Sequence, residues 1–229
     1  MAADHQIPVL AVVGPTASGK TALAVQLAKT FGGEVIGADS MQVYRHMDIG
    51  SAKIRSKEMQ GISHHLIDVL EPEEEFHVVK FQQMAKEALD GIYQRGHIPI
   101  VVGGTGFYIQ ALLYDISFED NEEDHSYRKE LEELAQEEGA EKLHQMLRQV
   151  DEKAALEIHA NNVKRVIRAL EFYHQTGEKI SEHNAKEREK ESAYNSAYFV
   201  LNDDRANLYE RINKRVDAMF EEGLVEEVT

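Results

Sequence analysis

The first half of the chain alternates short runs of β-branched residues with apolar positions at helical spacing. Residues 9–13, 34–38 and 98–102 are apolar runs short enough to be buried strands, and residues 65–70 are a possible further strand. Helical spacing fills the intervals, first from about Gly19 to the Gly32–Gly33 pair and later along an apolar face made of Phe81, Met84, Ala85, Ala88, Leu89 and Ile92. This alternation predicts βαβ units and a parallel sheet flanked by helices.

The pattern changes near residue 117, beyond which glycine becomes scarce and glutamate and lysine become frequent. Apolar residues at helical spacing continue to about residue 192, and the run 197–201 then predicts one more core strand. A closing helix follows, with an apolar stripe of Leu208, Ile212, Val216 and Met219. We therefore expect an α/β core domain formed by residues 1–116 and 193–229, with a helical insertion domain at residues 117–192.

The composition indicates a soluble cytoplasmic protein without a membrane partner. Of the 229 residues, 42% are hydrophobic and none is cysteine, which excludes disulfides, Cys-based zinc sites and thiol catalysis. The N-terminus lacks the basic region of a secretory signal. The net charge of −16 argues against nonspecific binding of polyanions. More than half of this excess lies between Glu119 and Glu157, where 14 acidic side chains face 5 basic ones, so the rest is only mildly acidic.

The stretch VVGPTASGKTAL at residues 12–23 contains the pattern Gly, any four residues, Gly, Lys, Thr. Its place between a predicted strand and a predicted helix is typical of a P-loop, and it predicts a P-loop NTPase-like fold. Glycines let backbone N–H groups turn toward phosphate oxygens, Lys20 neutralises their charge, and the Thr21 hydroxyl reaches Mg²⁺. The helix N-terminus adds a dipole that favours an anion. The predicted phosphate site comprises Gly14, Pro15, Thr16, Ala17, Ser18, Gly19, Lys20 and Thr21.

A P-loop alone does not identify the phosphate compound, because ATP-binding kinases, ATPases and other diphosphate-using enzymes share it. Asp39 stands at the end of the second predicted strand, on the side of a parallel sheet where ligands bind. Its carboxylate fits a catalytic base or a metal ligand. An N-cap for the segment that follows is the alternative structural interpretation.

Six stretches of the sequence resemble, in the same order, successive blocks of the bacterial tRNA dimethylallyltransferase family, also called the tRNA isopentenyltransferase family. They are GPTASGKTALA, ADSMQVYRHMDIGSAK, HHLIDVLEPEEEFHV, VVGGTGFYIQALL, NNVKRVIRALEFY and LYERINKRVDAMFEEGLVEEV. Family members usually extend beyond the last block by several helices. Together with the uncapped amphipathic end at residues 226–228, the resemblance implies a C-terminally truncated chain.

The resemblance implies transfer of a dimethylallyl group from dimethylallyl diphosphate to N6 of adenosine 37, next to the anticodon of tRNAs that read codons beginning with U. The P-loop would hold the donor diphosphate with Mg²⁺ as cofactor, and Asp39 would be the general base. Arg211 and Arg215 would reach the donor phosphates. Their alternative is a solvated helix face that pairs with Glu210 or Asp217.

The resemblance also implies contacts with the tRNA anticodon stem-loop. The matching positions near the target adenosine are Ser40, Met41, Gln42 and Thr105, beside Asp39. The matching stretch of the insertion is Lys164, Arg165, Val166, Ile167 and Arg168, in which helical spacing separates a basic face from a packing face that includes the valine and the isoleucine. A second basic cluster that would meet tRNA phosphates comprises Lys53, Arg55 and Lys57.

Two other functions fit the same residues. A small-molecule or nucleoside kinase shares the P-loop and the C-terminal arginines, and phosphorylation by ATP without an isoprenoid would favour it. A noncatalytic P-loop RNA-binding module would require an Asp39→Ala protein to match the intact one in every turnover assay. The presence of both DSMQVYR and GGTGFY favours prenyl transfer, by an enzyme that we expect to be a monomer.

Overall fold

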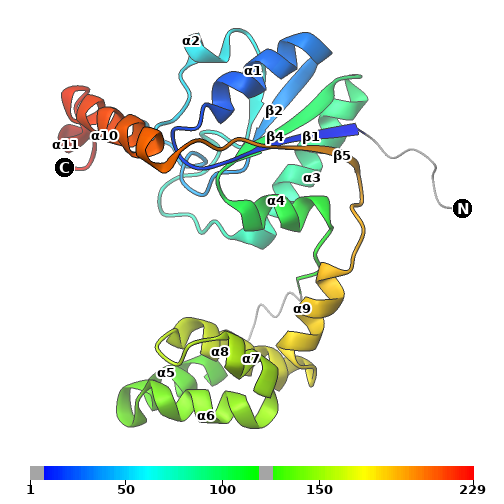
Figure 1. Ribbon diagram of the computed structural model, residues 1–229, viewed down its shortest axis with the longest axis vertical. Coiled ribbons are helices and arrows are strands. Elements are labelled where there is room, and N and C mark those ends of the chain that lie inside the picture. The colour runs from blue at the N-terminus through cyan, green and yellow to red at the C-terminus, as the bar shows by residue number, and fades with distance from the viewer. Residues whose placement is uncertain (1–7, 119–125) are drawn as a thin grey trace, which may run out of the picture. The chain divides into compact units, whose positions relative to one another are not determined.

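The computed structural model describes residues 8–118 and 126–229, which form two compact units (Figure 1). The first unit contains the described residues up to 116 together with 192–229, and the second contains those between 117 and 191. These borders lie within one residue of the ones expected for the α/β core and the helical insertion.

The first unit is built on a five-stranded sheet whose strand pairs are all parallel. Its strands are β1 (Pro8–Val13), β2 (Gly33–Gly37), β3 (His64–His65), β4 (Ile98–Gly103) and β5 (Asn195–Val200). Their order across the sheet is β3-β2-β4-β1-β5, which confirms the predicted parallel α/β fold. Because the strands run the same way, the carboxyl ends of β1, β2 and β4 meet at one edge of the sheet, where ligands bind in such folds.

Helices cover both faces of this sheet (Figure 1). On one face, α3 (Val78–Gln94) and α4 (Gly106–Leu113) pack Phe81 and Leu112 into a cluster with Val101 of β4. On the other face, α1 (Lys20–Phe31) packs Ala24 and Ala28 into a cluster with Ile100 of the same strand. Since both sides of the central strands β1, β2 and β4 are mostly buried, their sequences are largely continuous apolar runs rather than alternating ones, whereas most of the edge strand β5 is exposed.

Two expected elements differ from the structure. Of the possible strand at residues 65–70, only His65 pairs in the sheet, as the second residue of β3, because Leu66 and Asp68 have φ values of 60° and 54° that an extended strand excludes. The closing helix is interrupted at Gly223, whose φ of 99° ends α10 (Arg205–Glu221) and allows a separate α11 (Leu224–Glu227). A further short helix, α2 (Ser56–Met59), lies between β2 and β3.

The second unit is helical throughout its described residues. Its helices are α5 (Ser126–Glu138), α6 (Ala140–Val150), α7 (Glu152–Glu157), α8 (Val163–Thr176) and α9 (Ile180–Arg188). They enclose a separate apolar cluster that includes Leu131, Leu143, Leu147, Val166 and Leu170. Across residues 8–118 and 126–229, no helix has both the length and the apolar character needed to cross a membrane.

Asp151 is a buried polar contact that joins two helices of this second unit. Its carboxylate caps α7 by accepting the N–H of Ala154 at 3.0 Å, and it accepts the N–H and the hydroxyl of Ser181 of α9 at 2.9 and 2.7 Å. Burial opposes ionisation of Asp151, but these three donors outweigh it and lower the pKa of the carboxyl. The stabilisation is therefore present above the carboxyl pKa of the unfolded chain and is lost as pH falls through the lowered folded-state pKa.

An Asp151→Ala variant is expected to lower the free energy of unfolding by about 2–4 kcal/mol, because it leaves buried donors without an acceptor and removes a helix cap. The measurement is denaturant unfolding at neutral pH, followed by helical circular dichroism. Glu152→Ala, at an exposed position of the same helix, is the matched control. Equal midpoints for the two variants would show that the Asp151 contacts contribute nothing.

Candidate active site

The P-loop connects β1 to α1 at the carboxyl edge of the sheet. Gly14 has a φ of 153°, and a Cβ added there would lie only 2.5 Å from the carbonyl oxygen of Leu201, so no larger residue fits. Gly19 has a φ of 89° immediately before α1, which is a left-handed conformation that glycine adopts without strain. The two glycines therefore allow the chain to curl around the N-terminus of α1, where backbone N–H groups and the helix dipole favour an anion.

Polar side chains of the P-loop are arranged as a phosphate site requires. The Lys20 ammonium donates to the carbonyl oxygen of Pro15 at 2.7 Å, across the loop. Within residues 8–118 and 126–229, the buried Ser18 hydroxyl has no hydrogen-bond partner, so it has unused hydrogen-bonding capacity inside the cradle. Thr21 lies exposed in the first turn of α1.

The two arginines of α10 reach this loop from the other end of the sequence. Arg211 donates to the carbonyl oxygen of Ala17 at 3.4 Å and forms an ion pair with Asp203. The pKa of Lys20 is lowered, first by burial and then by the positive charge of Arg215, while the negative charge of Asp39 opposes the shift. Arg215 and Asp39 therefore both lie within electrostatic reach of Lys20.

The alternative interpretation of the α10 arginines does not hold for Arg211. The expected surface partner Glu210 instead pairs with Lys214 at 2.6 Å. The acidic partner of Arg211 is Asp203, which precedes the helix and which the sequence analysis did not single out. Asp203 therefore holds Arg211 beside the P-loop, so this arginine is not simply part of a solvated helix face.

Asp39 follows β2 at the same edge of the sheet. Its Oδ1 atom accepts the backbone N–H groups of Met41 at 2.8 Å and Gln42 at 3.3 Å, so it does cap the following turn. The pKa of Tyr108 on α4 is raised, first by burial and then by Tyr44 and Asp39. The carboxylate thus lies within electrostatic reach of both Lys20 and Tyr108, and within the described residues its hydrogen bonds to the turn use only the Oδ1 atom.

The other residues expected near the target base lie around Asp39. Met41 is 42% exposed, and the Gln42 amide donates to the carbonyl oxygens of Ser51 and Ala52 at 3.1 and 3.3 Å. Thr105 directly precedes α4, after β4. The N–H of Ala38 donates to the carbonyl oxygen of Val102 at 2.7 Å, so the ends of β2 and β4 lie side by side. Asp39 and the turn that contains Thr105 therefore share one edge.

The chemistry of the donor atoms limits the metals that this site could hold. Within the described ranges, no group of three His, Asp or Glu side chains is arranged to bind a metal ion. A Mg²⁺ ion, by contrast, commonly takes only one or two protein ligands and completes its shell with waters and substrate phosphates. The hydroxyl of Thr21 beside an anion cradle fits that pattern.

The predicted tRNA-binding stretch of the second unit is divided by burial. Lys164, Arg165 and Arg168 are exposed on α8, as the helical spacing predicts. Val166 and Ile167 are only 0% and 4% exposed and belong to the apolar cluster of the unit. Their inclusion among the tRNA-binding residues is therefore corrected, because their side chains stabilise the helix packing and do not face solvent.

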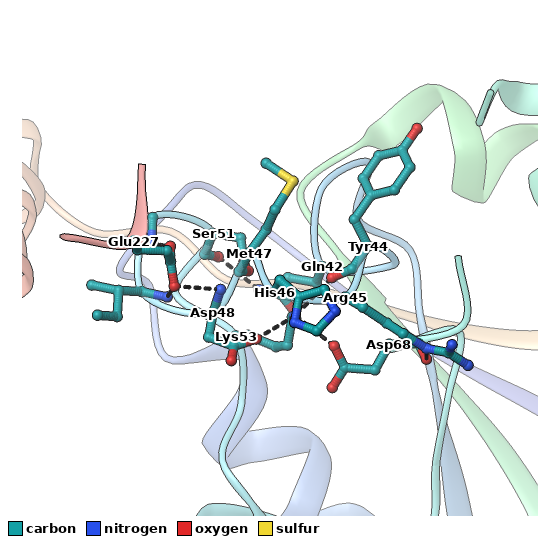
Figure 2. Close-up of polar contacts among 12 residues, drawn as sticks. Gln42, Tyr44, Arg45, His46, Met47, Asp48, Ser51, Lys53, Asp68 and Glu227 are labelled. Carbon is teal, nitrogen blue, oxygen red and sulfur yellow. Dashed lines mark hydrogen bonds and ion pairs between the residues drawn. The ribbon is translucent and has the colours of Figure 1, made fainter. Parts of the chain in front are cut away.

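The second predicted basic cluster is wrong for Lys53. Its side chain is buried, and its ammonium contacts Asp48, Asp68 and the carbonyl oxygen of Tyr44 at 2.5, 2.6 and 2.7 Å (Figure 2). Arg55 forms an ion pair with Glu222. Lys53 thus stabilises the loop that follows Asp39 from its interior, and two carboxylates already neutralise its charge.

Comparison with known proteins gives one consistent family. The model of the IPP transferase family matches residues 42–229. A tRNA dimethylallyltransferase of Lachnoclostridium phytofermentans is 61% identical over 221 residues, which cover 96% of this chain and 71% of that protein. The enzyme of the same name from Geobacillus thermodenitrificans is 51% identical over 220 residues, covering 96% and 70%.

Solved structures agree with these relatives. A eukaryotic dimethylallyltransferase acting on tRNA matches with a TM-score of 0.84 at 32% identity, over 96% of this chain and 55% of that one. A tRNA delta(2)-isopentenylpyrophosphate transferase from Staphylococcus epidermidis matches with a TM-score of 0.64 at 43% identity, over 97% and 72%. With its P-loop, its fold and most of its length matched in this way, the chain belongs to the IPP transferase family.

Proposed function

We propose that this protein transfers a dimethylallyl group from dimethylallyl diphosphate to N6 of adenosine 37, next to the anticodon of tRNAs that read codons beginning with U. The observation that supports this most is the convergence of a phosphate cradle, two arginines and a carboxylate at one edge of the sheet. The names of the relatives support the same reaction. We also propose a cytoplasmic location, where the anticodon loop is accessible to the enzyme.

On the donor side, the C–O bond of the allylic diphosphate breaks and its electron pair leaves with the diphosphate oxygen. Backbone N–H groups of the P-loop, the ammonium of Lys20 and the guanidinium groups of Arg211 and Arg215 stabilise this growing negative charge. Thr21 would hold Mg²⁺ together with the donor phosphates, and the bound ion would supply further charge neutralisation.

On the acceptor side, a bond forms between the allylic carbon and N6 of the adenine. This nitrogen is a poor nucleophile, since its lone pair is delocalised into the ring, so a nearby base increases its reactivity. Asp39 accepts the N6 proton as the new bond forms. The adenine must leave its stack to reach this carboxylate, at a cost of a few kcal/mol that is smallest in a single-stranded loop.

The proposal is tested by incubating the protein with carbon-labelled dimethylallyl diphosphate, Mg²⁺ and an unmodified tRNA in which adenosine 37 follows A36. We expect label in the RNA and one diphosphate released per group transferred. The matched acceptor has guanosine at position 37 and should remain unlabelled. Equal labelling of both RNAs, or diphosphate release with neither labelled, would refute transfer to this adenosine.

The exposed basic face of α8 gives a separate prediction for tRNA binding. Replacing Arg165 and Arg168 together by alanine should weaken tRNA binding about tenfold and reduce the slope of log K against log salt by about 1.5, because two phosphate contacts are lost. The measurement is a salt titration of binding. Arg148→Ala, at an exposed position of α6, is the control. An unchanged slope in the double variant would exclude these arginines from the RNA interface.

A further inference from the structure

The last helix of the chain contacts the loop that follows Asp39, as Figure 2 shows. The Oε2 atom of Glu227 accepts the backbone N–H groups of Asp48 and Ile49 at 2.8 and 2.6 Å, and its Oε1 atom accepts that of Gly50 at 2.8 Å. Three consecutive N–H groups that point to one spot form a nest, which is a binding concavity for an anion. The carboxylate of Glu227, which is 177 residues from Gly50 in the sequence, occupies this nest.

The loop is shaped for this contact by its own residues. The N–H of Ala52 donates to Ile49 and that of Lys53 to Asp48, both at 2.9 Å, which closes two tight turns around the nest. A Cβ added at Gly50 would lie 3.2 Å from Leu224 and 3.4 Å from Glu227, so the backbone approaches α11 closely there. The buried ammonium of Lys53 stabilises the same loop through ion pairs with Asp48 and Asp68.

The charge of Glu227 suits the nest. Burial opposes ionisation, but the three backbone donors outweigh it, so the pKa of the carboxyl is lowered in spite of the nearby Asp48. Hydrogen bonds between N–H groups and an ionised carboxylate are about twice as strong as those between neutral groups. The contact is therefore a strong tie between α11 and the loop at neutral pH.

This tie continues by hydrogen bonds to the candidate base. The segment next to the nest supplies the carbonyl oxygens of residues 51 and 52, which accept the side-chain amide of Gln42. The N–H of Gln42 in turn donates to Oδ1 of Asp39. From Glu227 the connection thus passes through residues 48–52 and Gln42 to the carboxylate of Asp39.

The same residue is anchored to the donor side. α11 follows α10 after a single interruption at Gly223, and Glu222 at the end of α10 forms an ion pair with Arg55, beyond the nest. α10 contains Arg211 and Arg215, the arginines beside the P-loop. Glu227 therefore joins the helix of the phosphate-binding arginines to the loop of the base.

We propose that Glu227 is a positioning residue for prenyl transfer: it holds the loop of residues 39–53 in register with the P-loop and α10, so that Asp39 meets the acceptor nitrogen opposite the donor carbon. This role rests on the proposed function. In the part of the chain that the structure describes, the hydrogen bonds of the Glu227 carboxylate go to residues 48–50 and not to the P-loop, so we expect its loss to affect the transfer step and leave donor binding intact.

The kinetic test compares Glu227→Ala and Glu227→Gln with the intact protein. For Glu227→Ala we expect kcat for tRNA prenylation to fall about tenfold or more and the Kd for dimethylallyl diphosphate to stay within about twofold, since misplacement of a catalytic group costs rate and not donor affinity. Glu227→Gln retains the side-chain length and one acceptor oxygen, so its loss should be smaller. Glu226→Ala, at the exposed neighbouring position, is the control.

A second measurement separates this role from the reaction itself. Amide hydrogen exchange at residues 48–50 should be slow in the intact protein and in Glu226→Ala, and faster in both Glu227 variants, whether or not any prenyl group is transferred. Absence of transfer by the intact protein would refute the proposed function, while exchange would still report on the tie. Exchange that is equal in all the proteins, or unchanged kcat despite faster exchange, would overturn the positioning role.

Discussion

An Asp39→Asn variant is expected to transfer dimethylallyl groups to tRNA about 10²–10⁴-fold more slowly than the intact protein, because the amide cannot accept the proton of the adenine N6. The substitution is selective, since the asparagine oxygen can still accept the N–H groups of Met41 and Gln42 that Oδ1 of Asp39 accepts. The turn should therefore survive. The measurement is the single-turnover rate with donor and tRNA both saturating.

The two roles of Asp39 are separated by a second substitution. Asp39→Ala should lose the same activity and also destabilise the loop by about 1 kcal/mol, because the turn loses its cap. Asp90→Asn, at an exposed position of α3, controls for the change in net charge. If the Asp39→Asn protein reacted at the rate of the intact one, Asp39 would not be the general base, and its carboxylate would serve only to cap the turn.

A Lys20→Met variant is expected to lose about 10²–10³-fold in kcat. This is the usual loss when an enzyme is deprived of one preorganised hydrogen-bond donor to the charge that develops in the transition state. Methionine fills a similar volume but supplies neither the positive charge nor the hydrogen bond to Pro15. Donor affinity should fall as well, because the same ammonium would face the diphosphate of the bound donor in the proposed site. Titration calorimetry of dimethylallyl diphosphate, combined with single-turnover kinetics, measures both effects.

The matched control for Lys20 lies on the same helix. Lys29 is exposed in the last turn of α1 and donates to the side chain of Gln60 at 2.6 Å, far from the P-loop end of the helix. Lys29→Met should change neither kcat nor donor affinity. Equal losses in both variants would mean that Lys20 acts only through the charge of the protein as a whole.

Local patterns explain why much of the fold could be predicted. The central strands β1, β2 and β4 are mostly buried on both faces, so their apolar runs stand out, and Gly32 and Gly96 follow the helices α1 and α3 that separate them. The prediction of a strand over residues 65–70 is wrong for the opposite reason: these residues are apolar enough for a strand, but positive φ values at Leu66 and Asp68 interrupt it. Aspartate adopts positive φ more often than leucine does, but neither residue type indicates it as clearly as glycine does.

The candidate site was predictable where its residues are consecutive and follow strands. The P-loop and Asp39 are of this kind, since a parallel sheet brings the ends of its strands together. Contacts between distant segments were not predictable in the same way. In the sequence Lys53 resembles any surface cation, although the fold pairs it with Asp48 and Asp68, and Glu227 is one of several glutamates in an amphipathic segment. Only folding brings each of these two side chains to its partners.

We infer that the P-loop serves a carbon transfer in which diphosphate is the leaving group. The most direct measurement is one incubation that contains carbon-labelled dimethylallyl diphosphate, ATP labelled at its γ-phosphate, Mg²⁺ and unmodified tRNA. The predicted result is carbon label at N6 of adenosine 37 and phosphorus label in no product. RNA without carbon label, together with a product phosphorylated from ATP, would contradict the claim and identify the P-loop as that of a kinase.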